Sequence, residues 1–288
     1  MKYMTKEWYE TMQNTNFHLL LRVSKKAEVF SEDYFKKLYK SEEKAWLRLQ
    51  EDVSKVKFED ICPDKFQAED DGRLLEPSEF EEAKKEYFEM REKARLNFVK
   101  IPAFDPEQEK KNFNQALQHN VKNLERNLPD EILQKIADIR VLALNRASAD
   151  IKKEITAYCK ANEKAVESAT KAYWKEYKKN FRDGEPAFTE KFNFHDCKVI
   201  SCRKKGKDVI LTLDNSGGFT TVSQIIFKNC SILKQDKPLH GVWWLYDEIY
   251  KTNGGYEIHV LLQKNELIDF IATVIDVEYR TCQGIQRQ

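Results

Sequence analysis

The placement of glycine divides this sequence into two parts with different folding preferences. Of nine glycines, Gly72 alone lies in residues 1–183, and the other eight lie in residues 184–288. Helix interiors exclude glycine because it costs about 1 kcal/mol relative to alanine there, whereas strand-and-turn structures use it at turns. The change falls at Asp183-Gly184-Glu185-Pro186, which is typical of a helix end. We therefore predict an α+β chain: an N-terminal multi-helix domain over 1–183, followed by a small, mostly antiparallel β domain over 187–288.

The first part has apolar residues at the three- and four-residue spacing of amphipathic helices. One such stripe runs from Tyr34 to Val53, and another runs from Ile151 to Tyr177 in a long last helix. Asp105-Pro106 combines a capping side chain with proline at the first helical position. We expect five or six helices. Their predicted starts are Thr5, Ser31, Pro77, Asp105, Pro129 (a helix carrying Ile132, Ile136, Ile139 and Leu142) and Ser148 or Asp150.

The second part changes to short apolar runs separated by turn residues. Asn253-Gly254 lies between two of these runs and is a strong hairpin signal. The predicted strands are Val199–Cys202, Val209–Leu213, Val222–Ile232, Val242–Tyr250, Tyr256–Leu262 and Ile268–Tyr279.

The net charge of the chain is +1, which gives no global attraction to nucleic acid or acidic lipid. We therefore expect neither nucleic acid nor a membrane as a partner. The local balance is less even, because residues 28–92 carry a net charge of −8 and residues 105–182 carry +4. Two solvated helix faces explain this pattern, and so does an acidic patch that meets a basic protein partner.

The six cysteines include no Cys-x-x-Cys pair, and a chain of this length does not need disulfides for stability. The opening Met1–Glu10 is charged, and no window approaches the ~18 apolar residues that span a bilayer. We expect a soluble cytoplasmic protein with no signal peptide and with all its thiols free.

Three short motifs could carry chemistry, and each has a simpler structural interpretation. His195-Asp196-Cys197 with Cys202 offers one cluster of zinc ligands where zinc sites show two. Asp214–Gly218 could hold an anion, but no lysine or helix follows it, as a phosphate loop requires. Arg203–Lys207 is a basic run that suits a hairpin tip. We nominate no catalytic residue, no metal ligand and no cofactor.

The best candidate site is the hairpin around Asn253-Gly254. If these are the two loop residues, Ile249 pairs with Ile258 and Leu245 with Leu262. Because alternate residues of a strand share a face, we predict one buried face that carries Trp243, Leu245, Ile249, Ile258 and Val260. Asp247 falls on the same face, where a buried carboxylate needs hydrogen-bond partners. The opposite face receives the candidate binding residues Trp244, Tyr246, Glu248, Tyr250, Glu257 and His259.

This face allows three interpretations. Exposed aromatic and charged residues together are typical of protein-binding hot spots. Glu248 opposite His259 could also form a catalytic pair. Alternatively, the helical part covers the face, and the pair is a satisfied internal contact.

Five short strings occur along the chain: Met1–Tyr9, Ala137–Leu144, Asp214–Phe219, Trp243–Tyr250 and Tyr256–Leu262. Together they resemble an uncharacterised bacterial family, the domain of unknown function 4085, and the resemblance runs over nearly the whole chain. It implies a Gram-positive cytoplasmic origin and brings no activity and no catalytic residues.

The leading functional hypothesis is a protein-binding module of unknown partner, for example an antagonist or immunity-type protein that neutralises a toxin. The alternatives are a hydrolase that uses Glu248 and His259, with or without a metal, and a helical scaffold or regulatory protein.

Overall fold

The computed structural model describes residues 1–66, 77–98, 101–181 and 192–281. The chain forms two compact units: Leu20–Glu154 is one, and Met1–Leu19 together with Ile155–Gln288 is the other. The N-terminal residues thus pack with the β-rich part of the chain rather than with the helices that follow them. The composition change at 183–186 lies outside the described residues.

The unit Leu20–Glu154 is built mainly from helices. They are η1 (Lys25–Ala27), α2 (Glu32–Ser54), α3 (Phe58–Ile61), α4 (Pro77–Asn97), α5 (Pro106–Asn127), α6 (Asp130–Leu133), α7 (Ile139–Ala143) and the first turns of α8 (Ala149–Asn180). A small parallel pair, β1 (Arg22–Val23) and β2 (Arg146–Ala147), joins its two ends. Buried Phe113 of α5 packs its ring against Tyr39 and Trp46 of α2, with centroids 5.1 and 6.0 Å apart.

The predicted helix after Pro129 is wrong as a single element. The chain instead forms two short helices, α6 and α7, and a new start at Asp138, whose side chain accepts a hydrogen bond from the backbone N–H of Arg140. A capping aspartate favours a helix start, so it interrupts the apolar spacing that suggested one continuous helix.

The other unit contains one eight-stranded sheet with the order β10-β5-β4-β3-β7-β8-β9-β6, and its strand pairs are antiparallel. The strands are β3 (Lys198–Lys205), β4 (Asp208–Asp214), β5 (Val222–Lys228), β6 (Ser231–Gln235), β7 (Val242–Thr252), β8 (Gly255–Gln263), β9 (Leu267–Val274) and β10 (Asp276–Thr281). These features confirm the predicted α+β class and the mostly antiparallel sheet.

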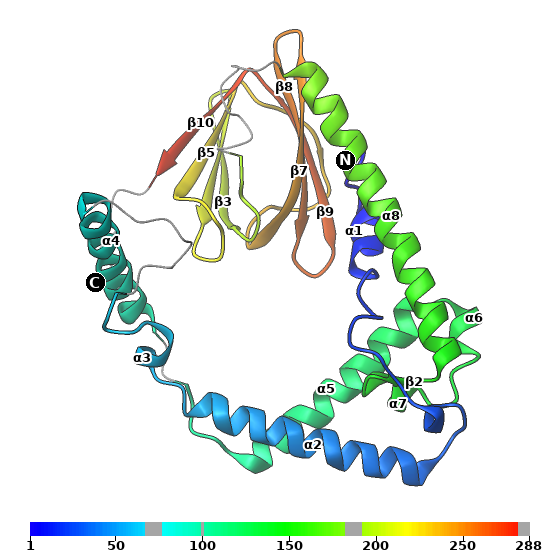
Figure 1. Cartoon of the computed structure of the whole chain (residues 1–288). Coiled ribbons are helices and arrows are strands. Elements are labelled where there is room, and N and C mark those ends of the chain that lie inside the picture. Colours follow the sequence, from blue (N-terminus) through cyan, green and yellow to red (C-terminus); the bar gives the residue numbers. More distant parts are fainter. Residues whose placement is uncertain (67–76, 99–100, 182–191, 282–288) are drawn as a thin grey trace. The chain divides into compact units, whose positions relative to one another are not determined.

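The sheet curls, so that its two halves face each other (Figure 1). Only Lys198 and Val199 of β3 pair with β7, which makes this the narrow junction between the halves. Buried residues from both halves, such as Phe227 of β5 and Phe270 of β9, belong to one core cluster, and their rings stack 6.1 Å apart. The sheet therefore encloses its own hydrophobic core.

Two predicted strands each divide into two. Val222–Ile232 breaks at Asn229, which takes a left-handed φ of 47°, and Ile268–Tyr279 breaks at Ile275. The breaks lie side by side, because the backbone N–H of Ile275 donates to the carbonyl of Lys228 at 2.9 Å. At both points the chain changes from one half of the sheet to the other, which hydrophobic runs alone do not reveal.

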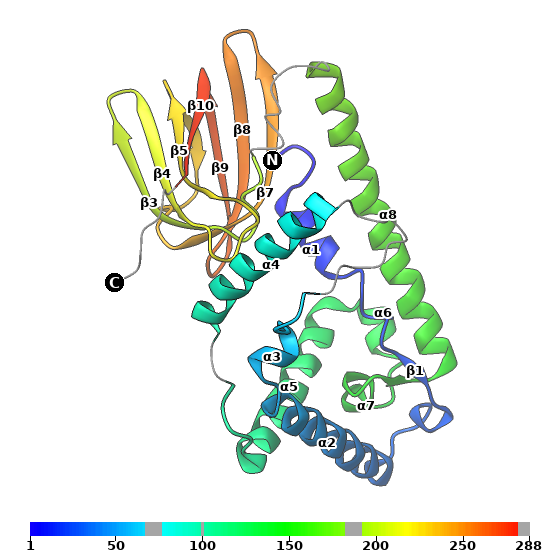
Figure 2. The same cartoon turned by 60° about the vertical axis from the view of Figure 1, so that its left-hand side comes forward.

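Helix α1 (Lys6–Gln13) and the C-terminal part of α8 lie beside the β7–β8–β9 half of the sheet, as the two views show (Figure 2). No helix in the described segments has the length and apolar character to cross a membrane. The five cysteines in these segments, namely Cys62, Cys159, Cys197, Cys202 and Cys230, are free thiols, and Cys282 lies outside them.

Candidate functional site

The β7–β8 hairpin has the two-residue loop that the sequence predicted. Thr252 pairs with Gly255, which leaves Asn253 and Gly254 as the loop. Glu248 then lies opposite His259, and Tyr250 opposite Glu257, as expected. The positive φ falls at Gly255, with a value of 150°, rather than at either loop residue.

A β-bulge at Leu245 overturns part of the predicted face assignment. The register shifts between Trp244 and Tyr246, so that Trp244, and not Leu245, pairs with Leu262. One extra residue in a strand reverses the faces beyond it. Trp244 is therefore fully buried in the sheet core, while Trp243, predicted to be buried, is 43% exposed. Leu245, Ile249, Ile258 and Val260 are buried as predicted.

The packing of Trp244 accounts for the bulge. Its ring meets those of Phe192 and Phe194 edge-on, with centroids 5.6 and 5.2 Å away. Its indole N–H donates to the Asp247 carboxylate at 3.1 Å. The predicted pairing placed Asp247 on the buried face, and its hydrogen-bond partner there is the indole of Trp244. Burial raises the pKa of Asp247 to about 7.

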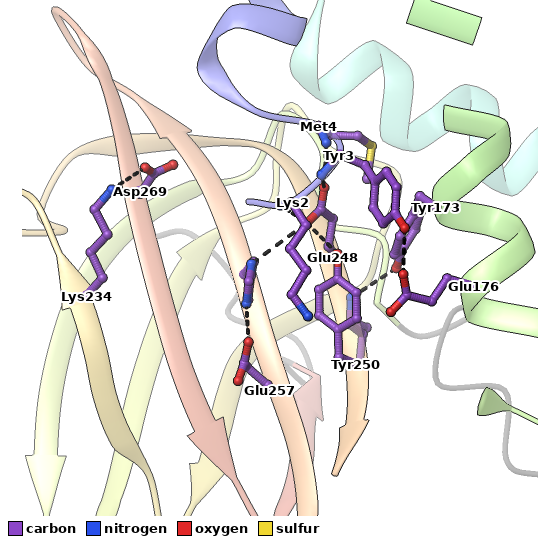
Figure 3. Close-up of polar contacts among 12 residues, drawn as sticks. Lys2, Tyr3, Met4, Tyr173, Glu176, Lys234, Glu248, Tyr250, Glu257 and Asp269 are labelled. Carbon is purple, nitrogen blue, oxygen red and sulfur yellow. Dashed lines mark hydrogen bonds and ion pairs between the residues drawn. The ribbon is translucent and has the colours of Figure 1, made fainter. Parts of the chain in front are cut away.

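The carboxylate of Glu248 is completely buried and binds the N-terminal backbone of the chain (Figure 3). One oxygen accepts from the N–H of Lys2 at 2.7 Å, and the other accepts from the N–H of Tyr3 at 2.8 Å and from that of Met4. The Tyr250 hydroxyl adds a fourth hydrogen bond at 2.8 Å. A buried carboxylate needs this number of donors to compensate for its lost hydration.

His259 lies beside this carboxylate and is itself 4% exposed. Its Nε2 is 2.6 Å from Glu257, and its Nδ1 is 3.8 Å from Glu248 with no hydrogen-bond partner. Burial lowers the pKa of His259, and the Glu257 hydrogen bond opposes that shift. A carboxylate can only accept, so His259 donates its Nε2 proton to Glu257.

Aromatic side chains from α1 and α8 cover the same face. Tyr173 of α8 is 2% exposed, and its hydroxyl accepts from the backbone N–H of Ile249 at 3.0 Å. Trp8 of α1 meets Tyr246 edge-on, with ring centroids 4.9 Å apart. The covering elements belong to the same compact unit as the sheet. Of our six candidate binding residues, Tyr246, Glu248, Tyr250, Glu257 and His259 do lie together, but under the chain's own N-terminal segment and helices.

The residues that complete this cluster were missed from the sequence. Backbone N–H groups of Lys2, Tyr3 and Met4 carry no sequence signature, because every residue except proline has one. Tyr173 belonged to a predicted helical stripe, which placed it on a buried face without naming its partner. Whether any of these residues binds another molecule stays a prediction.

The short motifs fold as turns and strand ends. Buried Cys197 packs so closely on Gly218 that a Cβ there would lie 2.4 Å from its Sγ, and burial raises its thiol pKa to about 11. Gly206, in the basic run, turns the chain between β3 and β4 with a φ of 62°. Within the described ranges, no group of three or more His, Cys, Asp or Glu side chains could hold a metal.

An open apolar groove in the helical unit is a second candidate site. It has a volume of about 620 Å³ between α2 and α5. Phe35 and Tyr39 line it from α2, while Leu117 and Val121 line it from α5, each pair one helical turn apart. The charged residues at its edges are Glu32, Lys36, Lys40, Lys122, Glu125 and Arg140.

The charges at the edges of this groove are unevenly neutralised. Arg140 donates to Glu32 at 2.8 Å, and Lys36 lies 3.9 Å from the same carboxylate. Lys40 and Lys122 make no ion pair with any residue that the structure describes. The lining holds four bases and two acids, and Asp138 outside it also pairs with Arg140 at 2.8 Å, so the positive excess of this edge is small and lies with Lys40 and Lys122.

A family model described as "Protein of unknown function (DUF4085)" matches residues 79–268, about two thirds of the chain. The match includes the β7–β8 hairpin and ends before β10, and it leaves Met1–Tyr9 outside. No curated protein and no solved structure matches the chain.

Proposed function

The chain belongs to this family of unknown function, and from that premise we propose that it is a protein-binding module of the bacterial cytoplasm that neutralises a partner protein by capturing one of its helices. The observation that supports this proposal is the groove between α2 and α5. Its walls are apolar, its edges are charged, and its volume of about 620 Å³ suits several buried side chains.

The shape of the groove favours a helical occupant. Two parallel rows of apolar residues, one from each helix, form a slot that can receive side chains spaced at i, i+3, i+4 and i+7. Phe35 and Tyr39 supply the aromatic surface that is enriched at protein-binding hot spots. An extended peptide that binds as an added strand would instead need an open sheet edge to pair with its backbone N–H and C=O groups.

The net positive edge selects the charge of that helix. Lys36 and Lys40 on α2, with Lys122 on α5, would face the flanks of a bound helix. Glutamates on those flanks would be attracted, and lysines would be repelled. We therefore infer an amphipathic helix with an acidic polar face.

The hairpin face fits this role less well than the groove does. Lys2, Tyr3 and Met4 already donate hydrogen bonds to both oxygens of Glu248, and His259 beside it is only 4% exposed. The hydrolase alternative would likewise require this segment to leave before substrate could reach the pair.

Two labelled peptides of defined sequence test the groove with the full chain. Both carry Leu and Phe on one helical face; one has Glu on the other face, and its twin has Lys. We expect the acidic peptide to bind with a Kd of about 10–100 μM, at least about tenfold more tightly than its twin. Val121→Glu should weaken that binding by about tenfold or more, because it places a carboxylate in the apolar slot.

The matched control is Val53→Glu, the same substitution at a 41%-exposed position of α2 outside the groove. It should leave peptide binding unchanged. Equal loss in both variants, or no preference for the acidic peptide, would overturn the groove proposal.

The neutralising role has its own test. A photo-crosslinker at position 121, and not at position 53, should capture a partner in the native cell. Expression of that partner should inhibit growth unless the native chain is present, and the Val121→Glu chain should fail to rescue growth. A captured partner whose activity is the same with and without the chain would refute the antagonist role.

A further inference from the structure

The outer face of the β10-β5-β4-β3 half of the sheet carries a pocket of about 500 Å³. The strand register defines its rows, because directly paired residues share a face. One row runs across the four strands and consists of Arg203, Ile210, Ile226 and Glu278. The next row contains Thr212, Gln224 and Arg280, and the row on the other side of the first contains the pair Lys205 and Asp208.

The lining carries an excess of positive charge. It includes Arg203, Lys204, Lys205, Lys228 and Arg280 against two acids, Asp208 and Glu278. Lys228 lies 2.7 Å from Asp208 and 3.5 Å from Glu278, so it already neutralises part of their charge. In the segments that the structure covers, Arg203, Lys205 and Arg280 have no carboxylate within ion-pair distance. Three unpaired cations around one hollow produce a positive potential that an anion would relieve.

The floor of this pocket is apolar. Ile210 and Ile226 pair with each other across β4 and β5 and are 8% and 3% exposed, although they point away from the sheet core. On a sheet face that is exposed to solvent, these central positions normally carry polar residues. Gln224 on the adjacent row adds an amide that can donate and accept hydrogen bonds beside the isoleucines.

The spacing of the cations sets the length of the ligand. Arg203 lies on β3 and Arg280 on β10, three strand spacings apart, which is about 14 Å. A chain of phosphates attached to a flat organic group spans this width with one arginine at each end, whereas inorganic phosphate engages both arginines only when their long side chains fold inward over the centre. We propose that this pocket binds an organic polyphosphate of the nucleoside triphosphate class, with its phosphates on the arginines and its base on the isoleucine floor.

Isothermal titration of the full-length protein with ATP, GTP, inorganic tripolyphosphate and inorganic phosphate tests this site. We expect a nucleoside triphosphate to bind with a Kd of about 10–100 μM, and inorganic phosphate to bind at least about 100-fold more weakly. The double variant Arg203→Gln with Arg280→Gln should weaken triphosphate binding by about tenfold or more, because it removes a cation from each side.

A second double variant, Lys237→Gln with Lys264→Gln, removes the same net charge from residues outside the pocket and should change the affinity by less than about twofold.

Ile210→Ser tests the apolar floor of the pocket. It should weaken nucleotide binding and leave tripolyphosphate binding unchanged, with thermal unfolding used to verify that the variant is folded. If tripolyphosphate binds as well as the nucleotides and Ile210→Ser affects neither, the pocket recognises phosphate chains alone and the nucleoside part is wrong. If no triphosphate binds at about 1 mM, or if both double variants lose affinity equally, the site itself is refuted.

Discussion

The backbone N–H of Lys2 donates a hydrogen bond to the side chain of Glu248, 2.7 Å away and 246 positions later in the sequence. Together with the N–H groups of Tyr3 and Met4, it attaches the N-terminal segment to the centre of β7. This contact explains why Met1–Leu19 packs with the β-rich unit although the chain from Leu20 to Glu154 forms another.

Glu248→Ala should destabilise the β-rich unit by roughly 3–5 kcal/mol, because it leaves the buried N–H of Met4, the half-buried N–H groups of Lys2 and Tyr3 and the Tyr250 hydroxyl without their acceptor. Urea unfolding followed by tryptophan fluorescence measures the loss. The matched control is Glu257→Ala on the same face, whose side chain is 27% exposed and has His259 as its partner. It should cost about 1 kcal/mol. A similar cost for both variants would contradict the anchoring role of Glu248.

Asp247 should make the protein less stable as pH rises. Its pKa is raised to about 7 by burial, so the folded state holds a proton that the unfolded state releases near pH 4. The stabilisation that Asp247 gives to the folded state is fully present below its pKa in the unfolded chain and is lost as pH rises through about 7. His259 acts in the opposite direction, because its lowered pKa favours folding above the unfolded value of about 6.5.

Asp247→Asn separates these two groups. It keeps an oxygen that can accept from the Trp244 indole and removes the titration, so it should stabilise the protein at pH 8 by about 1–3 kcal/mol and by much less at pH 5. Unfolding curves at both pH values give the difference. A variant at position 247 that is equally destabilised at both pH values would show that Asp247 is ionised in the folded protein.

Local signals in the sequence predicted much of the fold correctly. Thr5, Ser31 and Asp105 each cap the helix that they were expected to start, because their side chains accept from N–H groups two or three residues later. The two-residue loop fixed the pairing of Glu248 with His259 in the same way. These features depend on residues that are neighbours in the chain, so the sequence alone can reveal them.

Features that depend on distant partners could not be predicted. The bulge at Leu245 arises because Trp244 packs on Phe192 and Phe194, some fifty positions earlier, and no local pattern encodes that contact. The acceptor role of Glu248 depends on backbone N–H groups, which look the same at nearly every residue. The candidate hairpin face was therefore assigned correctly in its register near the turn and wrongly beyond the bulge.

Gly255 is required by both its backbone conformation and its surroundings. It has a φ of 150°, and a Cβ at this position would lie 2.0 Å from the carbonyl oxygen of Val274. Gly255→Ala should therefore destabilise the protein by roughly 2–4 kcal/mol, measured by thermal or urea unfolding. Its neighbour Gly254 has no atom within 4 Å of the equivalent position, so Gly254→Ala should change stability by less than about 1 kcal/mol. Equal effects of the two substitutions would be inconsistent with this turn geometry.

Trp243 and Trp244 are adjacent and chemically identical, but the bulge gives them opposite environments. Trp244 is fully buried against Phe192, Phe194 and Asp247, whereas Trp243 is 43% exposed. Trp244→Ala should cost about 3–5 kcal/mol, because it leaves a large cavity and removes the hydrogen-bond donor of the half-buried Asp247 carboxylate. Trp243→Ala should cost about 1 kcal/mol, since much of its ring already contacts solvent. Without the bulge the two effects would be reversed, so urea unfolding of this pair tests the register shift directly. A larger loss for Trp243→Ala would mean that the strand alternates regularly through Leu245 and that Trp244 faces outward with Glu248.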